Sequence, residues 1–132
     1  MASVFTKIIR GEIPSYKVAE DENYIAILDA FPIVEGHTLV IPKQETDKLY
    51  ELDEQTYVGL MLFARRVARA LERAVPCIRV GVSVVGLDVH HVHVHLLPLN
   101  GPKDMDLNGE KLSLSAERMQ QIAQAIAARM DE

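Results

Sequence analysis

The chain has 132 residues, a length that fits one domain with a buried core of its own. Hydrophobic residues make up 48% of it, and 19 acidic residues against 14 basic ones give a formal net charge of −5. No stripe of Lys and Arg follows any segment, which argues against a general binder of nucleic acids or membrane surfaces.

The N-terminal residues show no targeting signal. They lack an apolar signal core, and no segment approaches the roughly 18 apolar residues of a membrane span. The single cysteine, Cys77, allows no internal disulfide and fits a reducing compartment. We therefore expect a cytoplasmic protein without a membrane or nucleic-acid partner.

The first third of the chain alternates short apolar runs with turn residues. We expect a short helix at 5–10, strands at 16–20 and 24–29 around a turn, a loop at 30–36 and a strand at 37–41.

The rest of the chain carries two longer helical patterns. We expect a helix at 53–75, strands at 79–85 and 89–97, a polar loop at 100–114, and a helix from the N-cap Ser115 to about residue 130. Together these elements predict one α+β domain over 1–132, with a mainly antiparallel meander sheet, one long central helix and a C-terminal helix.

A row of histidines is the most informative part of the sequence. His91, His93 and His95 alternate with apolar residues, so on a strand the three imidazoles share one face. Histidine is a mediocre strand former, and a row of protonated imidazoles would repel itself. The row therefore indicates chemistry near neutral pH. His90 has the opposite parity, and we assign it no role.

Three interpretations of the row are open. The histidines could simply form hydrogen bonds within a structural strand. Two of them, with His37 or an acid, could bind zinc, although a third ligand at i+4 is awkward on a straight strand. Alternatively, a central imidazole could attack phosphorus while its neighbours offset charge on the phosphate oxygens, which suits the spacing best.

The residues carry a resemblance to a known family. Residues 91–97 read His-Val-His-Val-His-Leu-Leu and resemble the motif His-φ-His-φ-His-φ-φ, with φ apolar, of the histidine triad (HIT) family of nucleotide hydrolases and transferases. Residues 5–14 resemble that family's N-terminal segment, and residues 28–32 with 36–43 resemble its central signature. The resemblance covers roughly residues 3–100, whereas the C-terminal loop and helix at 101–132 are not diagnostic.

The resemblance implies roles for the matched residues. His93 resembles the nucleophile that attacks the α-phosphorus and becomes a nucleotidyl-histidine. His91 and His95 resemble the partners that contact the phosphate and orient the ring, and His37 resembles the fourth histidine that supports the nucleophile. Asp29 resembles the carboxylate that accepts hydrogen bonds from the ribose hydroxyls, although it could instead be a plain turn acid.

The resemblance also implies a base pocket. Phe5, Ile8, Ile27 and Leu28 resemble its apolar walls, with an ordinary core role as the open alternative for each of them.

The loop before the triad departs from the family pattern. The family often places an amide and a small hydroxyl after the glycine there, whereas Leu87 and Asp88 follow Gly86 in this chain. Asp88 could protonate a leaving group if its pKa is raised, or repel the phosphate if it is not. A common asparagine has no clear match, Ser83 being the nearest polar residue. We still expect Ser83, Gly86, Asp88 and Val89 to border the substrate.

A second departure concerns metal. Many members carry a Cys-x-x-Cys pair that helps to hold a structural zinc, and Ser3 and Thr6 stand at those places here. We therefore predict that this zinc site is absent. No metal is required for the implied reaction, although magnesium on the phosphates would suit polyphosphate substrates.

The predicted function is hydrolysis of the bond between the α-phosphorus of a purine nucleoside monophosphate unit and its leaving group. The alternatives are a dinucleoside polyphosphate hydrolase and a slow or inactive nucleotide-binding regulatory protein. The resemblance also implies a homodimer. The sequence offers surfaces for it, because the consecutive apolar residues 60–63 cannot all face one core and the strand at 79–85 could pair at its edge.

Overall fold

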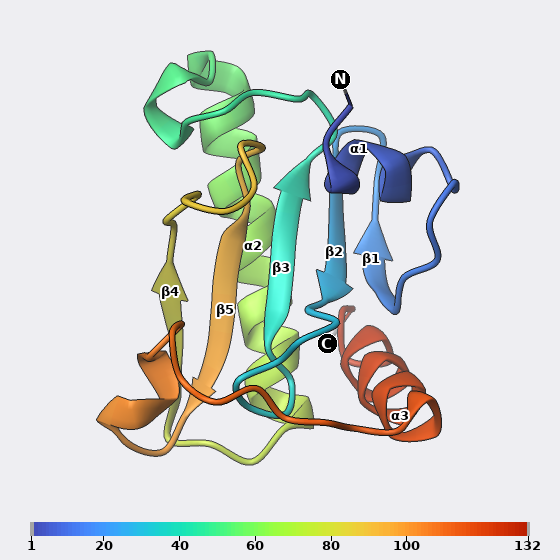
Figure 1. The fold of residues 1–132 in the computed structure, drawn as a ribbon, viewed down its shortest axis with the longest axis vertical. Coiled ribbons are helices and arrows are strands. Elements are labelled where there is room, and N and C mark those ends of the chain that lie inside the picture. Colours follow the sequence, from blue (N-terminus) through green and yellow to red (C-terminus); the bar gives the residue numbers. More distant parts are fainter. Residues whose placement is uncertain (1, 132) are drawn as a thin grey trace.

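A five-stranded antiparallel sheet forms the centre of the protein, with α2 and α3 on one face and α1 on the other (Figure 1). The structure, a computed structural model, describes residues 2–131, so the first and last residues of the predicted domain lie outside it. The elements are, in chain order, α1 (Val4–Ile9), β1 (Lys17–Glu20), β2 (Tyr24–Leu28), β3 (Thr38–Pro42), the 3-10 helix η1 (Leu49–Glu51), α2 (Glu54–Ala74), β4 (Arg79–Ser83), β5 (Val94–Leu99), the 3-10 helix η2 (Pro102–Met105) and α3 (Ala116–Ala127). The predicted α+β class is confirmed.

The strand order is β1-β2-β3-β5-β4, so only the first three strands form a simple meander. The long helix α2 then crosses behind the sheet and delivers β4 to the far edge, and β5 returns between β3 and β4 (Figure 1). This order places the histidine strand β5 in the interior of the sheet.

The predicted histidine strand at 89–97 begins later in the structure, at Val94. Its partner β3 ends at Pro42, which has no backbone N–H to extend the ladder, and its partner β4 ends at Ser83, opposite His95. Residues 89–93 therefore lie outside the ladder, with bends at His90 and His91 and a backbone hydrogen bond from the Val92 N–H to the Thr46 carbonyl.

Alternation along β2, β3 and β5 separates two apolar clusters. One lies between the sheet and helices α2 and α3 and takes Leu28, Val40, Val94 and Leu96. The other lies on the opposite face under α1, where Phe5 packs with the four side chains Ile25, Ile27, Leu39 and Ile41. The triad histidines share this second face.

Gly36 fixes the entry into β3. Its φ of +92° is a conformation that favours glycine, and a Cβ there would lie 3.1 Å from side-chain carbons of Val75 and Pro98. A larger residue would displace the chain just before His37, so this glycine positions the fourth histidine.

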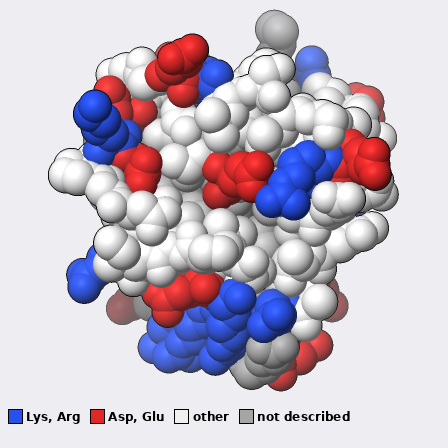
Figure 2. All heavy atoms as spheres, turned by 90° about the horizontal axis from the view of Figure 1, so that it is seen from below, with Lys and Arg blue, Asp and Glu red and all other residues white. Residues whose placement is uncertain are grey.

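The charged residues are unevenly spread. Seen from below, Lys and Arg gather in one patch on the helix side of the molecule (Figure 2). Arg66, Arg69 and Arg73 of α2 line a shallow hollow with Met130 and Asp131. Within residues 2–131, no helix combines the length and apolar character needed to cross a bilayer.

Candidate active site

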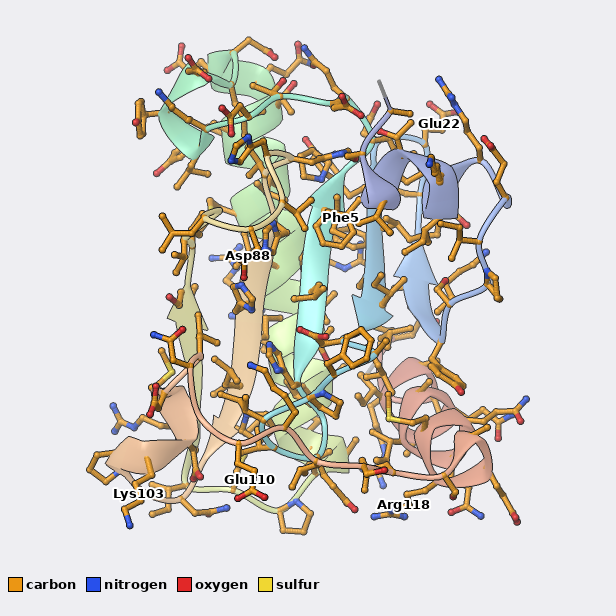
Figure 3. The ribbon with its side chains drawn as sticks, in the orientation of Figure 1. Phe5, Glu22, Asp88, Lys103, Glu110 and Arg118 are labelled. Atoms are coloured by element: carbon orange, nitrogen blue, oxygen red, sulfur yellow. The ribbon has the colours of Figure 1, made fainter. Side chains whose placement is uncertain are left out.

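A cavity of about 710 Å³ lies on the sheet face opposite α2. Phe5, from α1, and Asp88, from the loop between β4 and β5, lie on either side of its upper part (Figure 3). The histidines on its floor are His37, His93 and His95. The cavity therefore joins the N-terminal helix, the central strands and the loop before the triad.

His37 and His95 form a short hydrogen-bonded chain. The Ile33 N–H donates to His37 Nδ1 at 3.3 Å, so the neutral ring carries its proton on Nε2. That Nε2–H donates to His95 Nδ1 at 2.9 Å, and Asp29 Oδ2 lies 3.5 Å from the same Nε2. The remaining proton of His95 is consequently on Nε2.

His93 is held in the other tautomer, with its proton on Nδ1 rather than on Nε2 as in His37 and His95. Its Nδ1–H donates to the backbone carbonyl of His91 at 2.8 Å, which leaves the lone pair on Nε2. The ring is packed edge-on against Phe5 and His95, with centroid distances of 4.8 and 4.9 Å. Within residues 2–131, Nε2 has no hydrogen-bond partner and is not buried, so it opens to the cavity.

Burial keeps these rings neutral. It lowers the pKa of His37 and the pKa of His95 to about 4, with smaller contributions from nearby positive charge. It also lowers the pKa of His93, although the hydrogen bond to the His91 carbonyl acts the other way. At neutral pH the site therefore offers an uncharged nucleophilic nitrogen and an N–H donor.

His91 lies behind the cavity and does not line it. Its Nε2–H donates to the Pro42 carbonyl at 2.8 Å, and its Nδ1 accepts a hydrogen bond from the Ser3 hydroxyl at 2.7 Å. Of the two roles expected for His91, contact with phosphate does not match this placement. Orientation of His93 matches it, because the His91 carbonyl holds that ring.

Glu45 joins the group around His91, a contact that the sequence did not suggest. Its Oε1 accepts hydrogen bonds from the Ser3 N–H at 2.8 Å and from the Thr6 hydroxyl at 2.5 Å. These hydrogen bonds lower the pKa of Glu45 to about 2, and the bond from the Ser3 N–H has the largest effect. Ser3 and Thr6 supply hydroxyls where a structural zinc site of this kind has thiolates, so these two residues do not fit that metal.

A second group has the right residue types for a metal. The ligand atoms of Asp29, His37 and His95 lie within 4.8 Å of one another, and this is the only such trio within residues 2–131. In the structure, however, both ring nitrogens of His37 and the Nδ1 of His95 are committed to hydrogen bonds. These three ring nitrogens thus hold the hydrogen-bonded chain together.

Asp29 combines two contacts. Its Oδ1 accepts a hydrogen bond from the Phe31 N–H at 2.9 Å, which is the bond of an ordinary turn acid. Its Oδ2 lies on the His37 side, and the residue lines the cavity. The structure therefore leaves an oxygen of this carboxylate for a ligand while the other holds the loop.

The remaining predicted residues all border the cavity. These are Phe5, Ile8, Ile27, Leu28, Ser83, Gly86, Asp88 and Val89. Ile27 packs with Phe5 on the cavity face, whereas the Leu28 side chain belongs to the core between the sheet and α2. For Leu28 the core role is therefore the one that its side chain fulfils.

Several cavity residues were missed by the sequence reasoning. Val4 and Leu39 could have been found, the first beside Phe5 and the second by its parity with His37. The segment at 105–111 also contributes Met105, Asp106, Leu107, Asn108 and Lys111. Nothing in its polar, irregular sequence pointed to this contribution.

Comparison with known proteins agrees with this geometry. A family model described as "HIT domain" matches residues 10–101. An uncharacterized HIT-like protein of Borreliella burgdorferi is 33% identical over 132 residues, spanning 94% of this chain and 95% of its own. The adenosine 5'-monophosphoramidase of Saccharomyces cerevisiae is 36% identical over 103 residues, spanning 77% of this chain and 65% of its own.

Solved structures share the whole fold. The crystal structure of a Hit-like protein from Bartonella henselae superposes with a TM-score of 0.83 at 30% identity, covering 96% of this chain and 95% of its own. A zinc-bound histidine triad family protein from Mycobacterium smegmatis gives a TM-score of 0.85 at 28% identity, and the match covers 99% of this chain and 94% of that protein. The matched family model and these relatives show that this chain belongs to the HIT family.

Proposed function

We propose that this protein is a nucleotide hydrolase that cleaves the bond between the α-phosphorus of a purine nucleoside monophosphate unit and its leaving group. The observation that carries the proposal is the state of His93, whose Nδ1 is bound to the His91 carbonyl while the neutral Nε2 opens to the cavity. Two relatives named adenosine 5'-monophosphoramidase, at 36% and 27% identity, support adenosine as the nucleoside and a phosphoramidate as the substrate class.

The first step forms a covalent intermediate. The lone pair of His93 Nε2 attacks the α-phosphorus, an N–P bond forms, and the bond from phosphorus to the leaving group breaks. The electron pair departs with the leaving group, which takes up a proton to leave as a neutral amine. We assign the supply of this proton to solvent at the mouth of the cavity.

His95 and His37 stabilise that step. The hydrogen-bond chain from Ile33 leaves a proton on His95 Nε2, where it donates to a non-bridging phosphate oxygen. Because the donor is already oriented, little reorganisation is needed when charge on the phosphate oxygens rises.

The second step restores the enzyme. Water attacks the phosphorus of the nucleotidyl-histidine, the N–P bond breaks, and the electron pair returns to His93 Nε2. The water loses one proton to solvent, which balances the proton taken up by the leaving group in the first step, and the nucleoside monophosphate leaves. The ribose would bind the free oxygen of Asp29, and the base would lie among Phe5, Ile8 and Ile27.

The test is the variant His93→Ala, assayed with an adenosine phosphoramidate and by AMP binding. We expect kcat to fall by a factor on the order of a thousand or more, because the nucleophile is lost. AMP should still bind, since the ribose and base contacts remain. His90→Ala is the matched control and should keep both, because His90 is exposed and lies outside the cavity lining.

A His93→Ala enzyme that retains a tenth of the activity would contradict the mechanism. Single-turnover kinetics test the alternative of a slow nucleotide-binding protein, which would bind AMP without a burst of leaving group. All assays should be repeated after exhaustive chelation, where the proposed reaction continues and a metal-dependent one stops.

A further inference from the structure

The segment after η2 closes one end of the cavity. Residues 105–108 and Lys111 line it, although they lie in the part of the chain beyond the histidine strand. The Leu112 N–H donates to the Pro32 carbonyl at 2.7 Å, which fastens this segment to the loop that leads into His37. In Figure 3, Glu110 marks this segment where it crosses the lower end of the sheet.

The cavity has an unbalanced set of charges. Three carboxylates line it, from Asp29, Asp88 and Asp106, and within the described residues Lys111 is the only Lys or Arg that does so. Burial keeps the histidines uncharged at neutral pH, so they add no positive charge. An anionic phosphate entering this cavity would therefore meet one cation.

Lys111 is positioned to act at the histidine end. Its Nζ donates to the Leu107 carbonyl at 2.6 Å, which holds the side chain within its own loop and leaves two of its three N–H donors for a ligand. Lys111 lines the same cavity as His37 and His95, and its charge disfavours protonation of both rings.

We propose that Lys111 is a phosphate-binding residue of the cavity, and that it makes the site select anionic nucleotides over neutral nucleosides. The proposal rests on the proposed function, because it assigns the phosphate to the same cavity. It adds a contact from the C-terminal segment, with the ammonium group facing the phosphate oxygens at the His37 and His95 end.

The experiment compares AMP with adenosine, which share the base and ribose and differ in the phosphate. Binding of both would be measured by calorimetry for the wild type, Lys111→Gln, Lys111→Arg and Lys103→Gln. Lys103 is the matched control because it is exposed on η2, in the same segment, and points away from the cavity (Figure 3).

We expect Lys111→Gln to weaken AMP binding by about tenfold while the affinity for adenosine stays within twofold. Lys111→Arg should keep most of the AMP affinity, and Lys103→Gln all of it. The preference for AMP should also shrink with added salt in the wild type more than in Lys111→Gln.

The other outcomes are distinct. An unchanged ratio of AMP to adenosine affinity in Lys111→Gln overturns the role of Lys111 and leaves the proposed function standing. An equal loss of both affinities makes Lys111 a structural part of the wall and also overturns the proposal. If the wild type binds neither ligand, the proposed function fails, and this inference fails with it.

Discussion

At the scale of single residues, the site depends on which ring nitrogen carries each proton. Backbone carbonyls accept from His91 and His93, and a backbone N–H directs the tautomer of His37, which in turn directs that of His95. Main-chain groups are fixed by the fold. The sheet and its loops therefore determine, before any ligand binds, that His93 presents a lone pair and His95 an N–H.

The same burial makes stability sensitive to acid. His37 and His95 have a pKa of about 4 in the folded protein and 6.5 when unfolded. Between these values the unfolded chain binds more protons, so stability is present above pH 6.5 and is lost as the pH falls toward 4. We expect the free energy of unfolding to fall by about 1.4 kcal/mol per pH unit for each of the two histidines.

Urea unfolding at several pH values between 6.5 and 4.5 measures this slope. His37→Asn should reduce it, because one proton-binding group is removed, whereas His90→Asn should leave it in place. A free energy of unfolding that is constant over this range would show that the folded histidines take up protons freely.

At the scale of elements, α1 is attached to the triad through its N-cap. The Ser3 hydroxyl accepts from the Thr6 N–H at 3.0 Å and donates to His91 Nδ1, a ring that is fully buried. Ser115 caps α3 in the same way, because its hydroxyl accepts a hydrogen bond from the Arg118 N–H, also at 3.0 Å. The two serines differ because Ser3 also donates a hydrogen bond to His91.

We therefore expect Ser3→Ala to destabilise the protein more than Ser115→Ala. Loss of an N-cap costs about 1 kcal/mol in either case, and Ser3→Ala also leaves a buried imidazole nitrogen without its donor, at about 1–3 kcal/mol more. Chemical denaturation of the two variants measures the difference. Equal losses would mean that the bond to His91 contributes nothing to stability.

Comparison of the predicted and observed elements shows which features of the fold follow from local sequence patterns. The helix predicted at 53–75 is α2 with Asp53 as its N-cap, because periodicity and an acidic first turn are local signals. The late start of β5 depends on where its neighbours end. The cavity wall at 105–111 and the Glu45 contact depend on segments that meet only in the folded chain, and no local pattern encodes such meetings.

At the scale of the whole molecule, β4 forms a free edge of the sheet. Val82, on that strand, and Leu87, in the loop after it, are 51% and 81% exposed, and Leu62 on α2 is 48% exposed. An open edge beside exposed apolar side chains suits pairing with a second copy across a twofold axis. We expect a homodimer.

Light scattering at micromolar concentration tests the dimer, with an expected mass twice that of the 14.7 kDa chain. Val82→Glu should lower the mass toward one chain, because it places a charge at the paired edge. Lys17→Glu, on β1 at the opposite edge, is the matched control and should stay dimeric. A wild-type mass near one chain would contradict the prediction.

The contacts that build the site also affect the order of folding. Ser3 and His91 are 88 residues apart in the chain, and His37 and His95 are 58 apart. Contacts of such high sequence separation close large loops and form late, whereas the β1–β2 hairpin and α2 depend on near neighbours. A chain emerging from the ribosome thus builds its helix and first strands long before a cavity exists. The cavity wall is complete only after residue 111 has been synthesised, so the whole cavity is among the last features of the chain to form.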